Sequence, residues 1–472
     1  TFDLDKLNSI GNGNFTKPTN YDLFVKDKSQ ITGAKTDITG NVGVMNESTL
    51  SLKSITLKDT QGNTKDIQAT SIKNSIIVEG KESKLQVQDK ITSQNQDNTL
   101  IVVNGFRETT GGGTRDIVNG VRQEVIHEAT LSTTGGIELE GTTQRGLNQT
   151  CSGDKSGVGC FDDESMQGKI SNIVLTTGGK IESNLKATNL QLNVNVDKDS
   201  SFLGKDKTLT ADKSSVALNF ELGGEKEQEF NIDAKEKSHI TLTAHAKEAL
   251  AKDTTAFEKA LESSQYKGKI TADNGSQIDS NLSNITASVD LKNGASLNVA
   301  NGGILTLKDS LNSINLSGAN TALNVGTIVA DNLQNLTLNV GQDSKFNVTN
   351  FVFKSGSVEA QKFYGQNVWL QDQASVTLKG NAGIEHNLYV SGDSTFKTES
   401  GKALKIDKEG ETKIQTEIGS KLEINKLEAS GKSNVYVALD LEKLDSNPKT
   451  KQVTQSQQKN FNIDAKGGIK TI

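Results

Sequence analysis

Two short stretches of the sequence begin like motifs of catalytic or nucleotide-binding proteins, and each lacks a required residue. Gly431-Lys432-Ser433 has the ending of a phosphate-binding loop, but that loop needs a glycine where Lys426 stands. Gly392-Asp393-Ser394 has the beginning of a serine-protease nucleophile motif, but Thr395 follows where a glycine is needed. A turn explains this triplet better, because Gly, Asp and Ser are common turn residues. We therefore predict no catalytic residue, no enzymatic activity and no cofactor.

Metal-binding residue types are too scattered to predict a metal site. His239 and His245 flank one predicted strand, but no nearby carboxylate or cysteine completes a set of ligands. Acidic residues are plentiful, so a carboxylate pair that cleaves a polysaccharide remains an open alternative. The single tryptophan and five tyrosines leave few rings on which a sugar could stack. The remaining histidines are His127 and His386.

The two cysteines of the chain, Cys151 and Cys160, lie close together among glycines. Such a pair is typical of a small loop closed by a disulfide in an oxidising compartment. A metal or redox pair would need closer spacing or further ligands nearby. We predict a Cys151–Cys160 disulfide.

A repeated pattern along most of the chain predicts the fold. A turn residue is followed by Ser and then by alternating apolar and polar residues, as in residues 81–87 (Lys-Glu-Ser-Lys-Leu-Gln-Val) and 293–299 (Asn-Gly-Ala-Ser-Leu-Asn-Val). Alternation of this kind indicates a short strand with one buried face. One such unit cannot bury its face alone, so units in series predict a stack in which each covers the next.

A coil of about 20 residues, with three short strands and three turns, fits a parallel β-helix. The fixed frame of a leucine-rich repeat is missing. An antiparallel β-sandwich array is the stronger rival, because alternation does not report strand direction. Hairpin dipeptides with paired flanking strands are scarce, which disfavours it. We predict an all-β parallel β-helix, a solenoid with loop insertions and one short helical insertion.

Changes in the pattern divide the chain into five segments. Residues 1–106, 167–243 and 267–472 are predicted to be coils of the β-helix. Residues 107–166, rich in Gly and Thr and containing the cysteine loop, are predicted to project from it as an insertion. In residues 244–266 the apolar spacing changes to between three and four, and Thr255-Ala256-Phe257-Glu258 is a capping-box pattern. This last segment is predicted to be the helical insertion.

The candidate binding face consists of polar residues between inward apolar ones. In a Leu-Asn-Val segment the Leu and Val point inward, so the Asn points outward. If their coils are adjacent, these side chains could stack as a hydrogen-bonding surface suited to glycans or to another copy of the chain. The alternative is that Asn is only a polar filler. The residues are Asn193, Asn298, Asn324, Asn339 and Asn347.

The composition narrows the classes of partner. The formal net charge is -6 with both signs mixed, and no basic cluster is interleaved with aromatic residues, so we expect no nucleic-acid partner. No apolar stretch is long enough to cross a bilayer, and we identify no signal peptide at Thr1. The chain is expected to be a mature segment or an excised part of a longer protein.

The repeats resemble the passenger domains of autotransporters, the surface-exposed products of type V secretion in Gram-negative bacteria. The likeness lies in residues 294–299 (Gly-Ala-Ser-Leu-Asn-Val), 343–348 (Asp-Ser-Lys-Phe-Asn-Val) and 419–424 (Gly-Ser-Lys-Leu-Glu-Ile). Within that class the chain is most similar to self-associating adhesins and vacuolating-cytotoxin-type passengers. These motifs indicate the architecture specifically, but they do not distinguish one family of passengers from another.

The resemblance implies a right-handed parallel β-helix outside the cell or on the bacterial outer-membrane surface, acting as a virulence factor. It implies a non-enzymatic role in adhesion, self-association or host interaction, with a host-cell receptor, a glycan or a second copy as partner. It also implies a separate C-terminal barrel, outside this chain, as the only contact with a membrane. The alternatives are a vacuolating or pore-forming toxin subunit and a glycan-active enzyme or phage tail-spike.

Overall fold

Every regular element in the described part of the chain is a β-strand. The computed structural model describes residues 2–3, 22–57, 74–94, 99–109, 117–118, 121–122, 124–142, 170–222, 227–245, 265–300, 303–341, 343–360, 366–380, 382–383, 387–406, 410–429 and 433–441. The chain divides into two compact units. The first comprises Thr1–Lys267 and Ser276–Asn281, and the second comprises Gly268–Gly275 and Leu282–Ile472.

The strands of the first unit are β1 (Phe2–Asp3), β2 (Leu23–Val25), β3 (Gln30–Thr39), β4 (Val42–Met45), β5 (Thr49–Leu57), β6 (Ser75–Glu79), β7 (Lys84–Val87), β8 (Lys90–Ser93), β9 (Leu100–Asn104), β10 (Phe106–Thr109), β11 (Ile117–Val118), β12 (Val121–Arg122), β13 (Glu124–His127), β14 (Ala129–Thr133), β15 (Gly136–Glu140), β16 (Ile170–Thr176), β17 (Gly179–Glu182), β18 (Leu185–Thr188), β19 (Gln191–Val196), β20 (Thr208–Asp212), β21 (Ser215–Glu221), β22 (Gln228–Glu229), β23 (Asn231–Lys235), β24 (His239–His245) and β26 (Gln277–Ser280). β25 (Tyr266–Ala272) has residues in both units.

The strands of the second unit are β27 (Asn284–Lys292), β28 (Ser296–Val299), β29 (Ile304–Lys308), β30 (Ser313–Ser317), β31 (Ala322–Asp331), β32 (Asn335–Val340), β33 (Lys345–Lys354), β34 (Ser357–Ala360), β35 (Asn367–Gln371), β36 (Ser375–Leu378), β37 (Ala382–Gly383), β38 (Asn387–Val390), β39 (Thr395–Thr398), β40 (Ala403–Ile406), β41 (Gly410–Glu417), β42 (Lys421–Glu423), β43 (Lys426–Ala429) and β44 (Ser433–Leu441).

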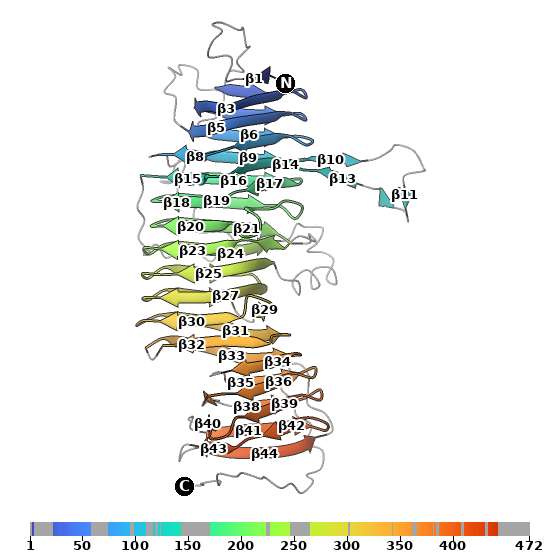
Figure 1. Ribbon diagram of the computed structural model, residues 1–472, viewed down its shortest axis with the longest axis vertical. Helices are drawn as coiled ribbons and strands as arrows, with labels where there is room; N and C mark the ends of the chain where they lie inside the picture. The colour runs from blue at the N-terminus through green and yellow to red at the C-terminus, as the bar shows by residue number, and fades with distance from the viewer. Residues whose placement is uncertain are drawn as a thin grey trace. The chain divides into compact units, whose positions relative to one another are not determined.

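Strands distant in sequence pair side by side in the same direction, as the repeat pattern predicts (Figure 1). In the first unit β3, β5, β7, β14 and β17 form one parallel ladder. Its register aligns one column of inward apolar residues, Ile31, Leu50, Leu85, Leu131 and Ile181. Two strand pairs, β10–β13 and β11–β12, are antiparallel. The all-β parallel prediction is confirmed, the architecture is consistent with a β-solenoid, and the antiparallel sandwich is excluded.

The recurring serine has a structural cause in the turn before each strand. The Ser238 hydroxyl donates to the backbone oxygen of Lys235 at 2.5 Å. It also accepts from the backbone N–H of Ser214 at 3.2 Å, and the backbone N–H of Ser238 donates in turn to the Ser276 hydroxyl at 3.2 Å. The buried Ser238 hydroxyl therefore satisfies its own turn and the neighbouring layer, as buried polar groups usually find partners. In the second unit Thr321 takes this role for the N–H of Gly294 at 3.0 Å.

The residues before the buried serine, or before the alanine that replaces it at Ala295, have the backbone conformation that the turn requires. Asn293 and Gly294 both have positive φ, at 50° and 81°. Asn, Asp and Gly enter this left-handed region at the lowest cost, which explains their recurrence at this position. The strand then begins with strict alternation, as in β28, where Leu297 is fully buried and Asn298 half-buried.

The second unit also buries side chains on both faces of some strands. In β35, Val368 and Leu370 are fully buried, and Trp369 between them is only 6% exposed. Trp369 stacks on Tyr389 of β38 with ring centroids 4.1 Å apart, and Val352 of β33 belongs to the same cluster. This second apolar layer removes the inward–outward alternation from these strands.

The segments predicted as insertions are only partly described. Within 107–166, β10 and β13 form a hairpin that leaves the parallel stack (Figure 1), whereas β14 and β15 pair in parallel with β7 and β8 inside it. Within 244–266, residues 244–245 end β24 and Tyr266 begins β25. The rest of the predicted helical insertion, residues 246–264, lies outside the described residues, as do Cys151 and Cys160.

Candidate functional site

Three of the predicted asparagines form one hydrogen-bonded row in the second unit. The amide nitrogen Nδ2 of Asn324 on β31 donates to Oδ1 of Asn298 on β28 at 2.6 Å. Nδ2 of Asn347 on β33 donates to Oδ1 of Asn324 at 2.6 Å. The register sets these contacts, since Asn298 pairs with Asn324 and Asn324 with Asn347. We call Asn298, Asn324 and Asn347 the outer asparagine row.

The outer row keeps hydrogen-bonding capacity at the surface. A carboxamide has two N–H donors and two acceptor lone pairs. In Asn324 the row uses one N–H and one lone pair. Asn324 is half-buried and Asn347 exposed. The carboxamide N–H and lone pair that the row does not use are therefore accessible from the solvent side. Because parallel strands are about 4.8 Å apart, the row presents repeated polar groups at that spacing.

The other two predicted asparagines lie in separate rows. Asn339 on β32 donates to Oδ1 of Asn315 on β30 at 2.8 Å. Asn193 belongs to the first unit, where it contacts Oδ1 of Asn172 at 3.4 Å and accepts from Asn219 at 2.7 Å. The five predicted residues therefore belong to three different rows.

A further row, which the sequence analysis missed, lies largely buried across β33, β35 and β38. Asn367 donates to Oδ1 of Asn350 at 3.2 Å and accepts from Nδ2 of Asn387 at 2.8 Å. Oδ1 of Asn387 accepts from the backbone N–H of Lys413 at 3.0 Å. Asn350 and Asn367 are 8% and 6% exposed. Each of the three asparagines precedes three consecutive apolar residues, a signal that could have identified this inner asparagine row.

A surface groove of about 800 Å³ crosses the first unit. Its lining runs from the end of β7 over the ends of β14 and β17 to the loop that follows β19, and then to β22. Gln86, Ser132 and Ser201 contribute neutral polar groups along this path. Its charged residues are Lys180, Glu182, Lys205, Lys207, Glu227 and Glu229.

The groove lies where the parallel ladder is interrupted. After β17 the ladder narrows to a single bridge between Lys180 and Ser201. The next strand, β22, is joined through a side chain, because Gln228 Nε2 donates to the Ser200 oxygen at 3.0 Å and its Oε1 accepts from the Phe202 N–H at 3.0 Å. A side chain added at Gly204 would meet no atom within 4 Å of its Cβ, so the loop is open there.

Beneath this interruption the core holds an unusual concentration of aromatic side chains. Phe202, Phe230 and Tyr266 are fully or almost fully buried and meet edge to face, with centroids 5.3 and 5.2 Å apart. Burial raises the pKa of the Tyr266 hydroxyl well above its ordinary value. These rings fill the interior below the groove, and none of them lines it.

The groove carries both bound and available charge. Lys180 and Glu182 form an ion pair at 2.6 Å, and the hydrogen bond to Glu182 raises the pKa of Lys180. Glu229 lies 3.6 Å from Lys267. Within the described part of the chain, the side chains of Lys205, Lys207 and Glu227 have no hydrogen-bond or ion-pair partner.

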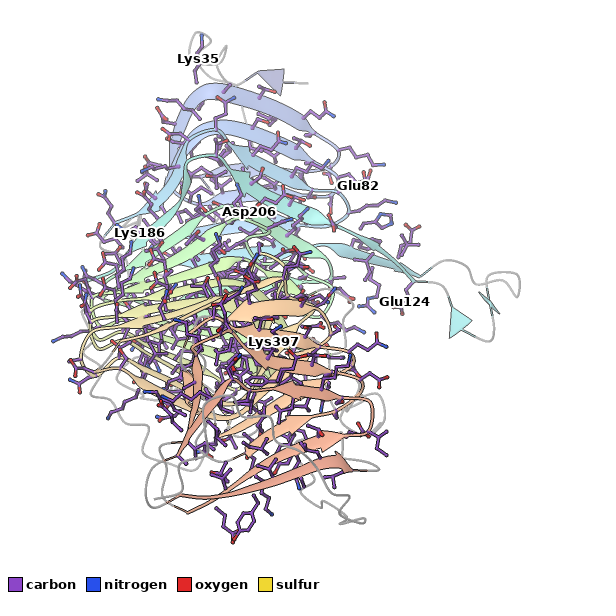
Figure 2. The ribbon with its side chains drawn as sticks, turned by 60° about the horizontal axis from the view of Figure 1, so that its bottom comes forward. Lys35, Glu82, Glu124, Lys186, Asp206 and Lys397 are labelled. Carbon is purple, nitrogen blue, oxygen red and sulfur yellow. The ribbon has the colours of Figure 1, made fainter. Side chains whose placement is uncertain are left out.

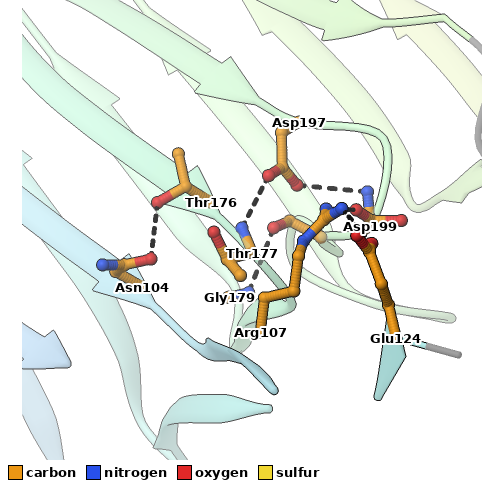
Figure 3. Close-up of polar contacts among 9 residues, drawn as sticks. Asn104, Arg107, Glu124, Thr176, Thr177, Gly179, Asp197 and Asp199 are labelled. Atoms are coloured by element: carbon orange, nitrogen blue, oxygen red, sulfur yellow. Dashed lines mark hydrogen bonds and ion pairs between the residues drawn. The ribbon is translucent and has the colours of Figure 1, made fainter. Parts of the chain in front are cut away.

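The β10–β13 hairpin is fixed at its root by ion pairs (Figure 3). Arg107 contacts Glu124 at 2.6 Å within the hairpin and Asp199 at 2.8 Å in the loop after β19. Asp197 in the same loop accepts from the backbone N–H of Thr177 at 2.6 Å, and Ser200 accepts from that of Gly179 at 3.0 Å. The loop thus connects the hairpin with the parallel stack.

On its other face the hairpin contacts the turn before β7. Glu108 lies 2.8 Å from His127 Nε2 and 3.2 Å from Lys81 Nζ. The hydrogen bond from His127, followed by the one from Lys81, lowers the pKa of Glu108 below its ordinary value. Phe106 and Val125 of the hairpin remain exposed.

The other sequence candidates for chemistry are not gathered into a catalytic or metal-binding arrangement that the structure describes. His239 and His245 lie at opposite ends of β24, and His239 Nε2 contacts Asp279 at 2.7 Å. Across the described ranges, no three His, Cys, Asp or Glu side chains are grouped as metal ligands. Those ranges also contain no helix long and apolar enough to cross a membrane. His386 lies outside them.

Comparison with known proteins returns no relative. No protein-family model, curated protein or solved structure gives a significant match to the chain. The function is therefore argued from the geometry and from the resemblance of the repeats.

Proposed function

We propose that the chain is a non-enzymatic, right-handed parallel β-helix that acts at a bacterial surface in adhesion, self-association or host interaction, as autotransporter passengers do. Its partner is another copy of the chain, a host-cell receptor or a glycan. The parallel ladders of both units support the architecture. Secretion and an extracellular location belong to the same proposal.

The outer asparagine row is the observation that carries this proposal. Asn298, Asn324 and Asn347 repeat one polar group at the spacing of the strands, and Asn324 and Asn347 have capacity for further hydrogen bonds. A partner with a matching repeat can bind along such a row. A second copy of the chain carries the same asparagine row, and a polysaccharide repeats its hydroxyl groups from one sugar to the next.

The test is a bulky charge placed in the row. Asn324→Lys should abolish self-association in sedimentation velocity and binding of the labelled chain to cultured epithelial cells. Thr337→Lys is the matched control, because Thr337 is an exposed polar residue on the separate β30–β32 ladder. The proposal is wrong if the wild-type chain neither self-associates nor binds cells, or if both variants behave alike.

A further inference from the structure

The groove of the first unit is long enough for an extended ligand. Its lining passes from Gln86 on β7 through β14 and β17 to Ser201, and then to Glu227 beside β22. These are five successive layers, so at about 4.8 Å per layer the groove extends over roughly 20 Å. A single small molecule would occupy only part of that length, whereas an oligomer would contact all of it.

Charge and hydrogen bonds, rather than stacking, must provide recognition in this groove. The nearby rings of Phe202, Phe230 and Tyr266 are buried, and no aromatic side chain lines the groove. The lining offers hydroxyl and amide groups together with the ammonium groups of Lys205 and Lys207. Carboxylates such as Glu227 only accept hydrogen bonds, and hydroxyl groups of a ligand can donate to them. Sugars combine the donors and acceptors that such a lining can bind.

The lysines and glutamates that line the groove determine which charge density of a ligand fits it. Lys180 is already paired with Glu182, so Lys205 and Lys207 are the cations available to an anionic group. Glu182 and Glu229 are likewise paired, with Lys180 and Lys267, so the carboxylate of Glu227 is the one that repels a densely charged polyanion in the part of the groove that the structure describes. A sparsely charged acid satisfies both conditions, because its carboxylates can meet the lysines while its hydroxyl groups meet the glutamates.

We propose that this groove binds an internal stretch of a linear acidic polysaccharide that carries about one carboxylate per two sugars. Lys205 and Lys207 bind a carboxylate of the polysaccharide, and Glu227 accepts hydrogen bonds from its hydroxyl groups. The inference deepens the proposed surface-binding function and rests on it for the setting in which such a polymer is met. The groove is separate from the outer asparagine row, which belongs to the other unit.

Isothermal titration with three hexasaccharides tests the ligand class. A hyaluronan hexasaccharide, with a carboxylate on every second sugar, should bind. A chitin hexasaccharide without carboxylates and a densely sulfated heparin hexasaccharide should both bind at least tenfold more weakly. Absence of hyaluronan binding at about 1 mM ligand, or stronger binding of heparin than of hyaluronan, would overturn the proposal.

Substitutions locate the site. Lys205→Ser combined with Lys207→Ser should weaken hyaluronan binding roughly tenfold for each lysine, because each charged hydrogen bond is lost. Lys186→Ser is the control, since Lys186 is an exposed lysine of β18 outside this groove and projects from the first unit in Figure 2. Glu227→Gln should raise the affinity for heparin relative to hyaluronan by removing a repulsive charge.

The outcomes separate this inference from the proposed function. If the double lysine variant binds hyaluronan as the wild type does, the groove is not the site, whatever Asn324→Lys does to self-association. If Asn324→Lys leaves self-association and cell binding unchanged while the double lysine variant loses hyaluronan, the outer-row proposal fails and the groove proposal stands. Equal circular dichroism spectra of all variants would show that folding is not the cause.

Discussion

The outer and inner asparagine rows of the second unit have the same chemistry and different surroundings. In both, one carboxamide donates to the next across parallel strands, at 2.6 Å between Asn324 and Asn298 and at 2.8 Å between Asn387 and Asn367. Asn324 is half-buried and Asn347 exposed, whereas Asn350 and Asn367 are almost completely buried. Burial therefore distinguishes the outer row, for which we propose partner binding, from the inner row, whose hydrogen bonds are shielded from water.

The physical basis of this difference is the competition with water. At the surface, breaking an asparagine contact lets water replace it, so the net contribution to stability is small. In the interior, the abandoned donor or acceptor has no replacement, and its desolvation is not compensated. Substitutions in the inner row should therefore lower the stability of the fold, whereas substitutions in the outer row should mainly weaken binding.

The largest effect is expected for Asn367→Ala. This change leaves Nδ2 of Asn387 and Oδ1 of Asn350 without their partner, and should lower the free energy of unfolding by roughly 2–4 kcal/mol. Urea unfolding followed by the fluorescence of Trp369, the single tryptophan, measures it within the same strand. A loss below about half a kcal/mol would mean that water reaches the inner row and that the two rows are equivalent.

A smaller effect on stability is expected for Asn324→Ala in the outer row. Its two contacts compete with water, so the free energy of unfolding should fall by about 0.5–1 kcal/mol. Self-association should weaken in sedimentation velocity, while Asn367→Ala should leave it unchanged under conditions where that variant is folded. If Asn324→Ala costs as much stability as Asn367→Ala, the outer row is structural and its proposed binding role is lost.

The smallest effect on stability is expected when the pH is lowered. The two asparagine rows should not respond, because neither contains a titratable side chain. The pKa of Glu108 is lowered by His127 and Lys81, so its contribution to stability is present above its unfolded pKa of about 4.3 and is lost as pH falls through the lower folded pKa. The hydrogen-exchange protection factors of β10 and β13, measured relative to the intrinsic exchange rate at each pH, should therefore fall below about pH 4. Glu108→Gln should remove this pH dependence, and unchanged protection factors in the wild type would contradict the assignment.

Much of the fold follows from patterns that are local in sequence. Alternation places Leu297 inside and Asn298 outside, and residues such as Asn293 and Gly294 accept the positive φ of the turn. The parallel direction was predicted from the repeat itself, because identical units stacked in series bring like positions together. The alignment of Asn298, Asn324 and Asn347 follows from the same argument.

Other features depend on which layers become neighbours. Each asparagine of the inner row precedes three consecutive apolar residues, but only the pairing of β33 with β35 places Asn350 beside Asn367. β35 loses its alternation because Trp369 packs against Tyr389 on the outer side. Next to the groove the Gln228 side chain bridges a gap in the ladder, and one glutamine has no sequence signature for that role.

The sequence by itself determined that this protein is a repetitive all-β chain with parallel strands, because turn chemistry and alternation act over a few residues. Only the tertiary structure decided which asparagines are buried, where the ladder is interrupted and which charges line the groove. These depend on the identity of the adjacent layer, and hydrogen bonds and burial between layers join residues such as Thr99 and Ser171 that are 72 positions apart. No local pattern records that distance.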